Sequence, residues 1–183
     1  MSKNKNNKPI WNTRINKGST NLFKKVGGSL LVDKRLFNED IEVSIVHVEM
    51  LFKQKIINFK IKNKIAWGLN RIRNEIIKKK FQFNENLEDI HMNIENRLFE
   101  LIGEDAGYIH TARSRNDQVI TDFKIWLKKA TNEIIKNLNL TINNILKNAD
   151  KNVETIMPGF THLKNAQPVS FAHYLLAYVE MFS

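Results

Sequence analysis

Apolar residues recur every three or four positions over most of the chain, which is the spacing of amphipathic helices. We expect helices over 36–57, 61–80 and 87–102, followed by a glycine-containing break at 103–107. Residues 116–150 contain neither glycine nor proline and continue the helical spacing without interruption. Alternating apolar and polar residues, which mark strands, are scarce. The pattern therefore predicts an all-α fold.

The predicted helix over 116–150 has a wide apolar face. Its main stripe runs from Val119 to Ala149, and side positions such as Ile120 and Leu127 widen it beyond the seam of a two-stranded coiled coil. A face of this width needs several neighbouring helices to cover it, which favours a bundle of long helices. At 1.5 Å per residue, the helix extends roughly 50 Å.

These elements predict three regions. We expect an extended arm over 1–28, a small N-terminal helical domain over 29–112 and, over 113–183, the first part of a central long-helix bundle. Within the last region, residues 153–167 predict a loop around Pro158 and Gly159. Pro168 suits the first turn of a final helix, because its missing N–H has no helical partner there.

Composition limits the classes of function. The net charge of +10 suggests a nucleic-acid partner, but no zinc-finger spacing, aromatic RNA-binding motif or glycine-rich phosphate loop accompanies it, so we expect none. The chain has no cysteine, which excludes thiolate metal ligands and fits a reducing compartment. No apolar run approaches the roughly 20 residues of a membrane span, and the basic start lacks the apolar core of a signal peptide. We expect a cytoplasmic protein with no membrane partner.

The segment His110–Gln118 reads H-T-A-R-S-R-N-D-Q and directly precedes the long predicted helix. Ser114, with Asp117 three residues later, is typical of a helix N-cap. Free backbone N–H groups and the positive end of the helix dipole then lie beside Arg115 and Asn116, which favours binding of a carboxylate or another anion. For an isolated S-R-N-D, a capped helix start with solvated arginines is the simpler interpretation.

Two further segments extend this motif. Pro158–Pro168 reads P-G-F-T-H-L-K-N-A-Q-P, and Glu88–His91 reads E-D-I-H. In this order the three segments resemble argininosuccinate lyases, which carry H-T-x-R-S-R-N-D-Q, P-G-[YF]-T-H-L-Q-x-A-Q-P and E-D-I-H. Those enzymes are more than twice as long, and their S-S-x-M-P-x-K-x-N loop with a catalytic serine has no counterpart here. We interpret the chain as an N-terminal portion of such an enzyme that ends inside a helix.

The resemblance implies a fumarase/aspartase-like fold and a β-elimination that splits argininosuccinate into arginine and fumarate. It implies no metal or organic cofactor, and the sequence offers no metal-ligand cluster by spacing. It also implies that the full-length protein is a homotetramer whose active sites draw on three subunits. Asn116 and His162 would then lie far apart in one chain, and the isolated 183-residue fragment would be inactive.

The resemblance also implies roles for individual residues. His162 is the catalytic histidine, and histidine side chains can exchange protons near neutral pH, although Thr-His alone is more typical of an exposed loop. The implied substrate-binding residues are Ser29, Arg115, Asn116 and Thr161, with Asp33, Asp89 and His91 as weaker candidates for substrate contact or for organising the pocket.

Two departures from the family pattern weaken parts of this assignment. Trp11-x-x-Arg14 is a weaker match, with Asn12-Thr13 in place of the usual glycine pair, and Gly27-Gly28 before Ser29 is also atypical. Two alternatives stay open. One is another lyase of the superfamily, acting on fumarate or adenylosuccinate, against which Arg113–Asp117 argues. The other is a non-catalytic, crystallin-like structural protein of the same fold.

Overall fold

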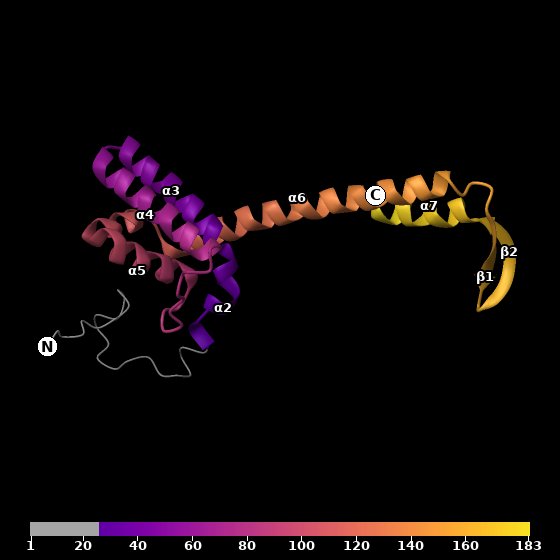
Figure 1. Ribbon diagram of the computed structural model, residues 1–183, viewed down its shortest axis with the longest axis horizontal. Coiled ribbons are helices and arrows are strands. Elements are labelled where there is room, and N and C mark those ends of the chain that lie inside the picture. Colours follow the sequence, from indigo (N-terminus) through magenta and orange to yellow (C-terminus); the bar gives the residue numbers. More distant parts are fainter. Residues whose placement is uncertain (1–25) are drawn as a thin grey trace. The chain divides into compact units, whose positions relative to one another are not determined.

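The computed structural model describes residues 26–183, which form two compact units, one up to Trp126 and one from Leu127 onward. The predicted arm over 1–28 lies almost entirely outside the described residues, and the predicted domain boundary after residue 112 stays a prediction. The described elements follow in this order: α2 (Leu30–Asp33), the 3-10 helix η1 (Lys34–Leu36), α3 (Phe37–Lys53), α4 (Phe59–Ile77), α5 (Ile90–Ile102), the 3-10 helix η2 (Gly103–His110), α6 (Arg115–Asp150), β1 (Ile156–Thr161), β2 (Lys164–Ser170) and α7 (Phe171–Phe182) (Figure 1). The fold is mostly helical, as the periodicity predicts.

The first unit has its core between α3, α4 and α5, which pack together in pairs. Its fully buried side chains are aliphatic residues at helical spacing: Ile41, Val48, Leu51, Ile65, Leu69, Ile72, Ile90, Ile94 and Leu98. At Gly68, α4 approaches α5 so closely that a Cβ atom would lie 2.5 Å from Leu98 Cδ1. The close approach explains why a glycine occupies a helix interior, where its conformational freedom is otherwise unfavourable.

Local signals place the ends of these helices. Asn58 caps α4 by accepting from the Ile61 N–H at 2.9 Å, and Asp89 caps α5 by accepting from the Met92 N–H at 2.7 Å. Gly103 ends α5 with a φ of 72°, a left-handed conformation that glycine adopts without a steric penalty. The chain continues through η2 to His110, the first residue of the H-T-A-R-S-R-N-D-Q motif.

The predicted loop over 153–167 is wrong: these residues contain most of an antiparallel hairpin made by β1 and β2 (Figure 1). The predicted role of Pro168 is also wrong, because Pro168 pairs with Pro158 in the hairpin, and α7 begins three residues later with Ser170 as its cap. In a two-stranded sheet both strands are edge strands, where proline is tolerated. The proline and glycine residues therefore belong to the strands.

The second unit contains most of α6, the hairpin and α7. Several large apolar side chains of α6 are more than half exposed within it: Ile134 at 59 %, Ile135 at 51 % and Leu140 at 60 %. The wide apolar face predicted for this helix therefore has little cover among the described residues. Across residues 26–183, no helix is both long and apolar enough to cross a membrane.

Candidate functional site

The H-T-A-R-S-R-N-D-Q segment begins α6, as predicted. Ser114 Oγ accepts from the Asn116 N–H at 3.2 Å, which confirms Ser114 as the N-terminal cap. Arg115 and Asn116 consequently occupy the first turn of the helix, where backbone N–H groups lack helical partners and the dipole is positive. Asn116 is exposed and Arg115 is partly buried.

Contacts with the first unit hold the loop before α6. His47 Nε2 lies 2.9 Å from the Thr111 carbonyl oxygen, Arg113 Nη1 donates to Ser44 Oγ at 3.1 Å, and His110 Nε2 lies 2.6 Å from Glu95 Oε1. The anchoring side chains come from α3 and α5. The first turn of α6 therefore has a fixed position within the first unit.

Arg115 is the most heavily contacted of the predicted substrate-binding residues. Its Nη1 donates to Gln118 Oε1 at 2.9 Å, its Nη2 lies 3.0 Å from Glu95 Oε1, and its Nε lies 3.7 Å from Asp89 Oδ2. The side chain remains 30 % exposed. Because a guanidinium carries five N–H donors, these contacts leave donors for a further anion.

Ser29 and Asp33, two weaker sequence matches, lie against the start of α5. Ser29 Oγ donates to Asp33 Oδ2 at 2.5 Å, and Asp33 Oδ1 accepts from the Ile90 N–H at 3.1 Å. The Ser29 N–H donates to the Glu88 carbonyl oxygen at 2.8 Å. The E-D-I-H motif thus organises both residues, and through Asp89 it also approaches Arg115.

His91 belongs to a buried polar cluster that the sequence does not reveal. Its Nδ1 lies 3.0 Å from Asp40 Oδ1 and 3.5 Å from Asp122 Oδ2, and Gln118 Nε2 donates to the same Asp40 oxygen. All four side chains are almost completely buried. They come from α3, α5 and α6. A signal exists in hindsight: Asp40 and Ser44 continue the helical spacing of the buried face of α3.

The two acids of this cluster are held in different charge states. Burial and the nearby Asp40 carboxylate raise the pKa of Asp122 to about 8. Burial also opposes the charge of Asp40, but the hydrogen bonds from His91 and Gln118 and the charges of His91 and Arg113 outweigh it and lower the Asp40 pKa. Near neutral pH, Asp40 carries the negative charge and Asp122 holds a proton.

The pKa of His91 depends on the charge of Asp40. Burial lowers the pKa of His91, but the hydrogen bond to Asp40 and the charge of that carboxylate outweigh it, so the His91 pKa is raised. The Asp40 carboxylate thus favours the protonated form of the buried His91 ring.

Asp40, His91 and Asp122 also have the composition of a metal site, contrary to the expectation of no ligand cluster. Packing brings one ligand atom of each within 4.8 Å of the others, although they are far apart in sequence. A metal would require a neutral imidazole and a free carboxylate oxygen. Without a bound metal, the raised His91 pKa favours the protonated ring, and the cluster shares its protons, with Asp122 protonated and Asp40 ionised.

Thr161 and His162 lie in the second unit, at the tip of the hairpin. Thr161 pairs with Lys164, and His162 and Leu163 form the two-residue turn between them, with φ values of 51° and 64°. Positive φ at both positions is the geometry of a type I′ turn, which joins tightly twisted strands. The side chains of Thr161 and His162 are exposed. The predicted separation of Asn116 from His162 within one chain stays a prediction.

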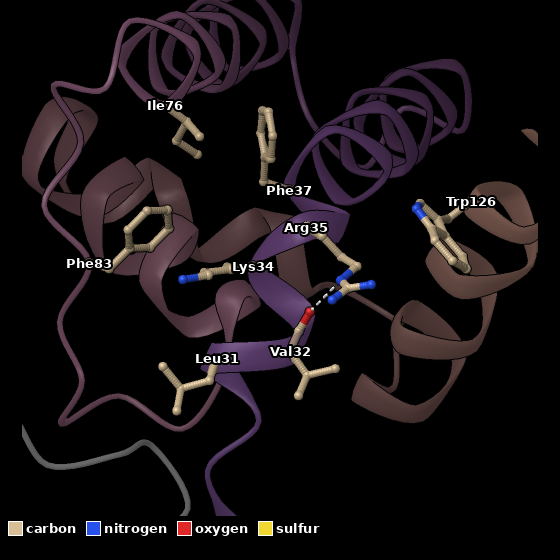
Figure 2. A pocket seen from close by; sticks show the side chains of 8 residues that line it. All are labelled: Leu31, Val32, Lys34, Arg35, Phe37, Ile76, Phe83 and Trp126. Carbon is tan, nitrogen blue, oxygen red and sulfur yellow. Dashed lines mark hydrogen bonds between the residues drawn. The ribbon is translucent and has the colours of Figure 1, made fainter. Parts of the chain in front are cut away.

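A separate open groove of about 570 Å³ lies in the first unit (Figure 2). Its lining is mostly apolar, with two cationic side chains: Leu31, Val32, Lys34, Arg35, Phe37, Ile76, Phe83 and Trp126. Arg35 is fixed by donating from Nε to the Val32 carbonyl oxygen at 3.1 Å (Figure 2). None of the residues predicted from the motifs lines this groove.

A family model described as lyase matches residues 13–183, which include the capped start of α6 and the E-D-I-H network. The chain belongs to this lyase family. It is 68 % identical over 183 residues to the argininosuccinate lyase of Pelagibacter ubique and 46 % identical over 182 residues to that of Bartonella bacilliformis. In each case all of this chain is covered, but only 40 % and 39 % of the relative. The chain thus spans about two fifths of the relatives it matches.

Solved structures agree with the fold. A double variant of EDDS lyase with bound fumarate has a TM-score of 0.69 and 26 % identity, over 80 % of this chain and 28 % of that one. A fumarate lyase from Mesorhizobium sp. BNC1 has a TM-score of 0.61 over 85 % of this chain and 38 % of that one, and its 17 % identity supports the fold alone. The likeness to argininosuccinate lyases does not favour the crystallin-like or other-lyase alternatives.

Proposed function

We propose that the full-length protein containing this chain is an argininosuccinate lyase, which splits argininosuccinate into arginine and fumarate. The observation that carries the proposal is the 68 % identity to the Pelagibacter ubique enzyme over the whole of this chain. The capped α6 terminus supports it, because its arrangement suits a substrate that carries several carboxylates.

The reaction is a β-elimination in which the chain's residues hold charge and move protons. A base takes a proton from the carbon beside a carboxylate, the resulting dianionic aci-carboxylate expels the guanidino nitrogen, and that nitrogen takes up a proton to give arginine. Asn116 and Arg115, at the positive end of α6, would stabilise the carboxylate charge as it develops. Ser29, whose hydroxyl donates to Asp33, is a further proposed substrate-binding residue.

His162 is the proposed proton-transfer residue, with Thr161 as a substrate contact. The positive φ of His162 places it in the two-residue turn, where its side chain is exposed rather than packed on the hairpin. Histidine can take up and release protons near neutral pH, and general acid–base catalysis contributes about 10²–10⁴-fold to rates. Asp89 would hold Arg115 and His91 would hold Asp40, so both would organise the pocket instead of contacting the substrate.

We also propose that the full-length protein is a cytoplasmic homotetramer. The exposed apolar residues of α6 support assembly, because apolar surface on this scale is usually covered by another helix or subunit. In such an assembly the hairpin of one subunit would complete the site begun by the α6 terminus of another.

Expression of the full-length reading frame tests the proposal directly. Incubation with argininosuccinate should release arginine and fumarate in equal amounts, the latter followed by ultraviolet absorbance. Adenylosuccinate and malate serve as competing substrates. Fumarate formation from either of these, with none from argininosuccinate, would overturn the assignment.

A further inference from the structure

Among the described residues, only Gln118 forms hydrogen bonds with both Arg115 and Asp40 through its side-chain amide. It lies one helical turn after Arg115 and is 1 % exposed. Its Oε1 accepts from Arg115 Nη1 at 2.9 Å, and its Nε2 donates to Asp40 Oδ1. A buried amide is stable only when both its ends have partners, so these two bonds define the position of the side chain.

Asp40 and Arg115 together determine the orientation of the Gln118 amide. An ionised carboxylate can only accept hydrogen bonds, so it takes the amide NH₂ and leaves the amide oxygen for the guanidinium. Asp40 is itself fixed by His91 Nδ1 at 3.0 Å, and α3 and α5 supply the two side chains. The rigid core of the first unit is thereby connected to Arg115 through a chain of named hydrogen bonds.

We infer that Gln118 is a positioning residue, which is held by Asp40 and orients the Arg115 guanidinium for a substrate carboxylate. The inference rests on the proposed function, in which Arg115 binds a carboxylate. Gln118 is suited to this role because it is an uncharged acceptor: it holds one edge of the guanidinium without neutralising its charge.

The acids around Arg115 show why such a residue is needed. Glu95 lies 3.0 Å from Nη2 and Asp89 lies 3.7 Å from Nε, so both compete with a substrate carboxylate for the same cation. A bond from Nη1 to Gln118 opposes rotation of the guanidinium toward these acids. Without that bond, only Glu95 and Asp89 would hold the guanidinium, and the binding of an external dianion would weaken.

Calorimetric titration of succinate into the full-length protein tests the inference without depending on turnover. In Gln118→Leu, which keeps the approximate volume and removes both bonds, the succinate dissociation constant should rise about tenfold, the equivalent of one hydrogen bond to a charged group. In an Arg115→Ala background, Gln118→Leu should change the constant less than about twofold, because the residue acts through Arg115. Ile72→Val, a core change of similar modest cost to stability, should leave succinate binding unchanged.

Asp40→Asn provides a second route to the same answer. The change replaces the charge-assisted hydrogen bond from Gln118 Nε2 with a weaker neutral one, so Gln118 is held less firmly, and succinate binding should weaken in the Arg115 background but not in Arg115→Ala. If Gln118→Leu fails to fold, this variant carries the test.

The inference is wrong if both single variants bind succinate like the parent protein, or if their effects persist undiminished without Arg115. The proposed function fails by a separate result, namely a parent protein that releases no arginine from argininosuccinate.

Discussion

The two regions that carry the predicted site residues are built in opposite ways. In the first unit, Arg115 is tied through Gln118, Glu95 and Asp89 to side chains of a buried helical core. In the second unit, His162 stands exposed in a turn of a two-stranded hairpin. The proposed carboxylate-binding residue is thus preorganised within one unit, whereas the proposed proton-transfer residue has an exposed side chain.

The largest effect is expected for His162, the exposed residue in the hairpin turn. His162→Asn in the full-length protein should lower kcat by about 10²–10⁴-fold, because a general acid–base group is lost while shape and polarity are roughly kept. His173→Asn, an exposed histidine in the first turn of α7, is the matched control and should retain activity. Circular dichroism should show unchanged helix content for both. Turnover of the His162 variant within a few-fold of the parent would remove this residue from the mechanism.

Arg115→Lys addresses the preorganised region. Lysine keeps the charge but loses the planar fork that contacts Gln118 and Glu95 together, so succinate should bind about tenfold more weakly. Isothermal titration of succinate provides the measurement, with Lys124→Arg on an exposed position of α6 as the control. Equal affinities would mean that the fork geometry does not matter for carboxylate binding.

The buried cluster should make stability depend on pH. The pKa of Asp122 is raised to about 8 in the folded protein, mainly by burial and by Asp40, while His91 and Arg113 oppose the rise. The folded state therefore binds more protons than the unfolded state between about pH 4 and 8, and stability falls as pH rises through this range.

Asp122→Asn should remove that contribution. The variant should gain thermal stability relative to the parent at pH 8.5 compared with pH 6, by a shift in Tm on the order of 5 °C. Asp117→Asn, exposed on the same helix, should show no such pH-dependent difference. Parallel pH profiles of Tm for Asp122→Asn and the parent would contradict the shared-proton description.

The smallest effect concerns the hairpin turn. Leu163 is 97 % exposed and has a φ of 64°, which costs a residue with a Cβ about 1 kcal/mol relative to glycine. Leu163→Gly should therefore raise the Tm of the full-length protein by about 1 °C, measured by calorimetry, with activity unchanged. Reduced activity with unchanged Tm would show that the leucine side chain contacts the assembled site.

The sequence determined the helices, their caps and the family. Helical periodicity depends on neighbours three and four residues apart, and caps such as Ser114 and Asp89 act on backbone groups within one turn, so both are local properties. The local pattern gave a wrong prediction at Pro158 and Pro168. Proline in a sequence usually indicates a loop, and its place in an edge strand becomes evident only when the partner strand is known.

Only the tertiary structure decided the polar cluster. Asp40, His91 and Gln118 are far apart in sequence, and no local pattern indicates that they meet. They meet because the packing of α3, α5 and the first turns of α6 removes them from water, and burial then requires them to share hydrogen bonds and protons. Electrostatic states such as the proton on Asp122 depend on distance through space and on dielectric surroundings, neither of which is encoded at any single position of the chain.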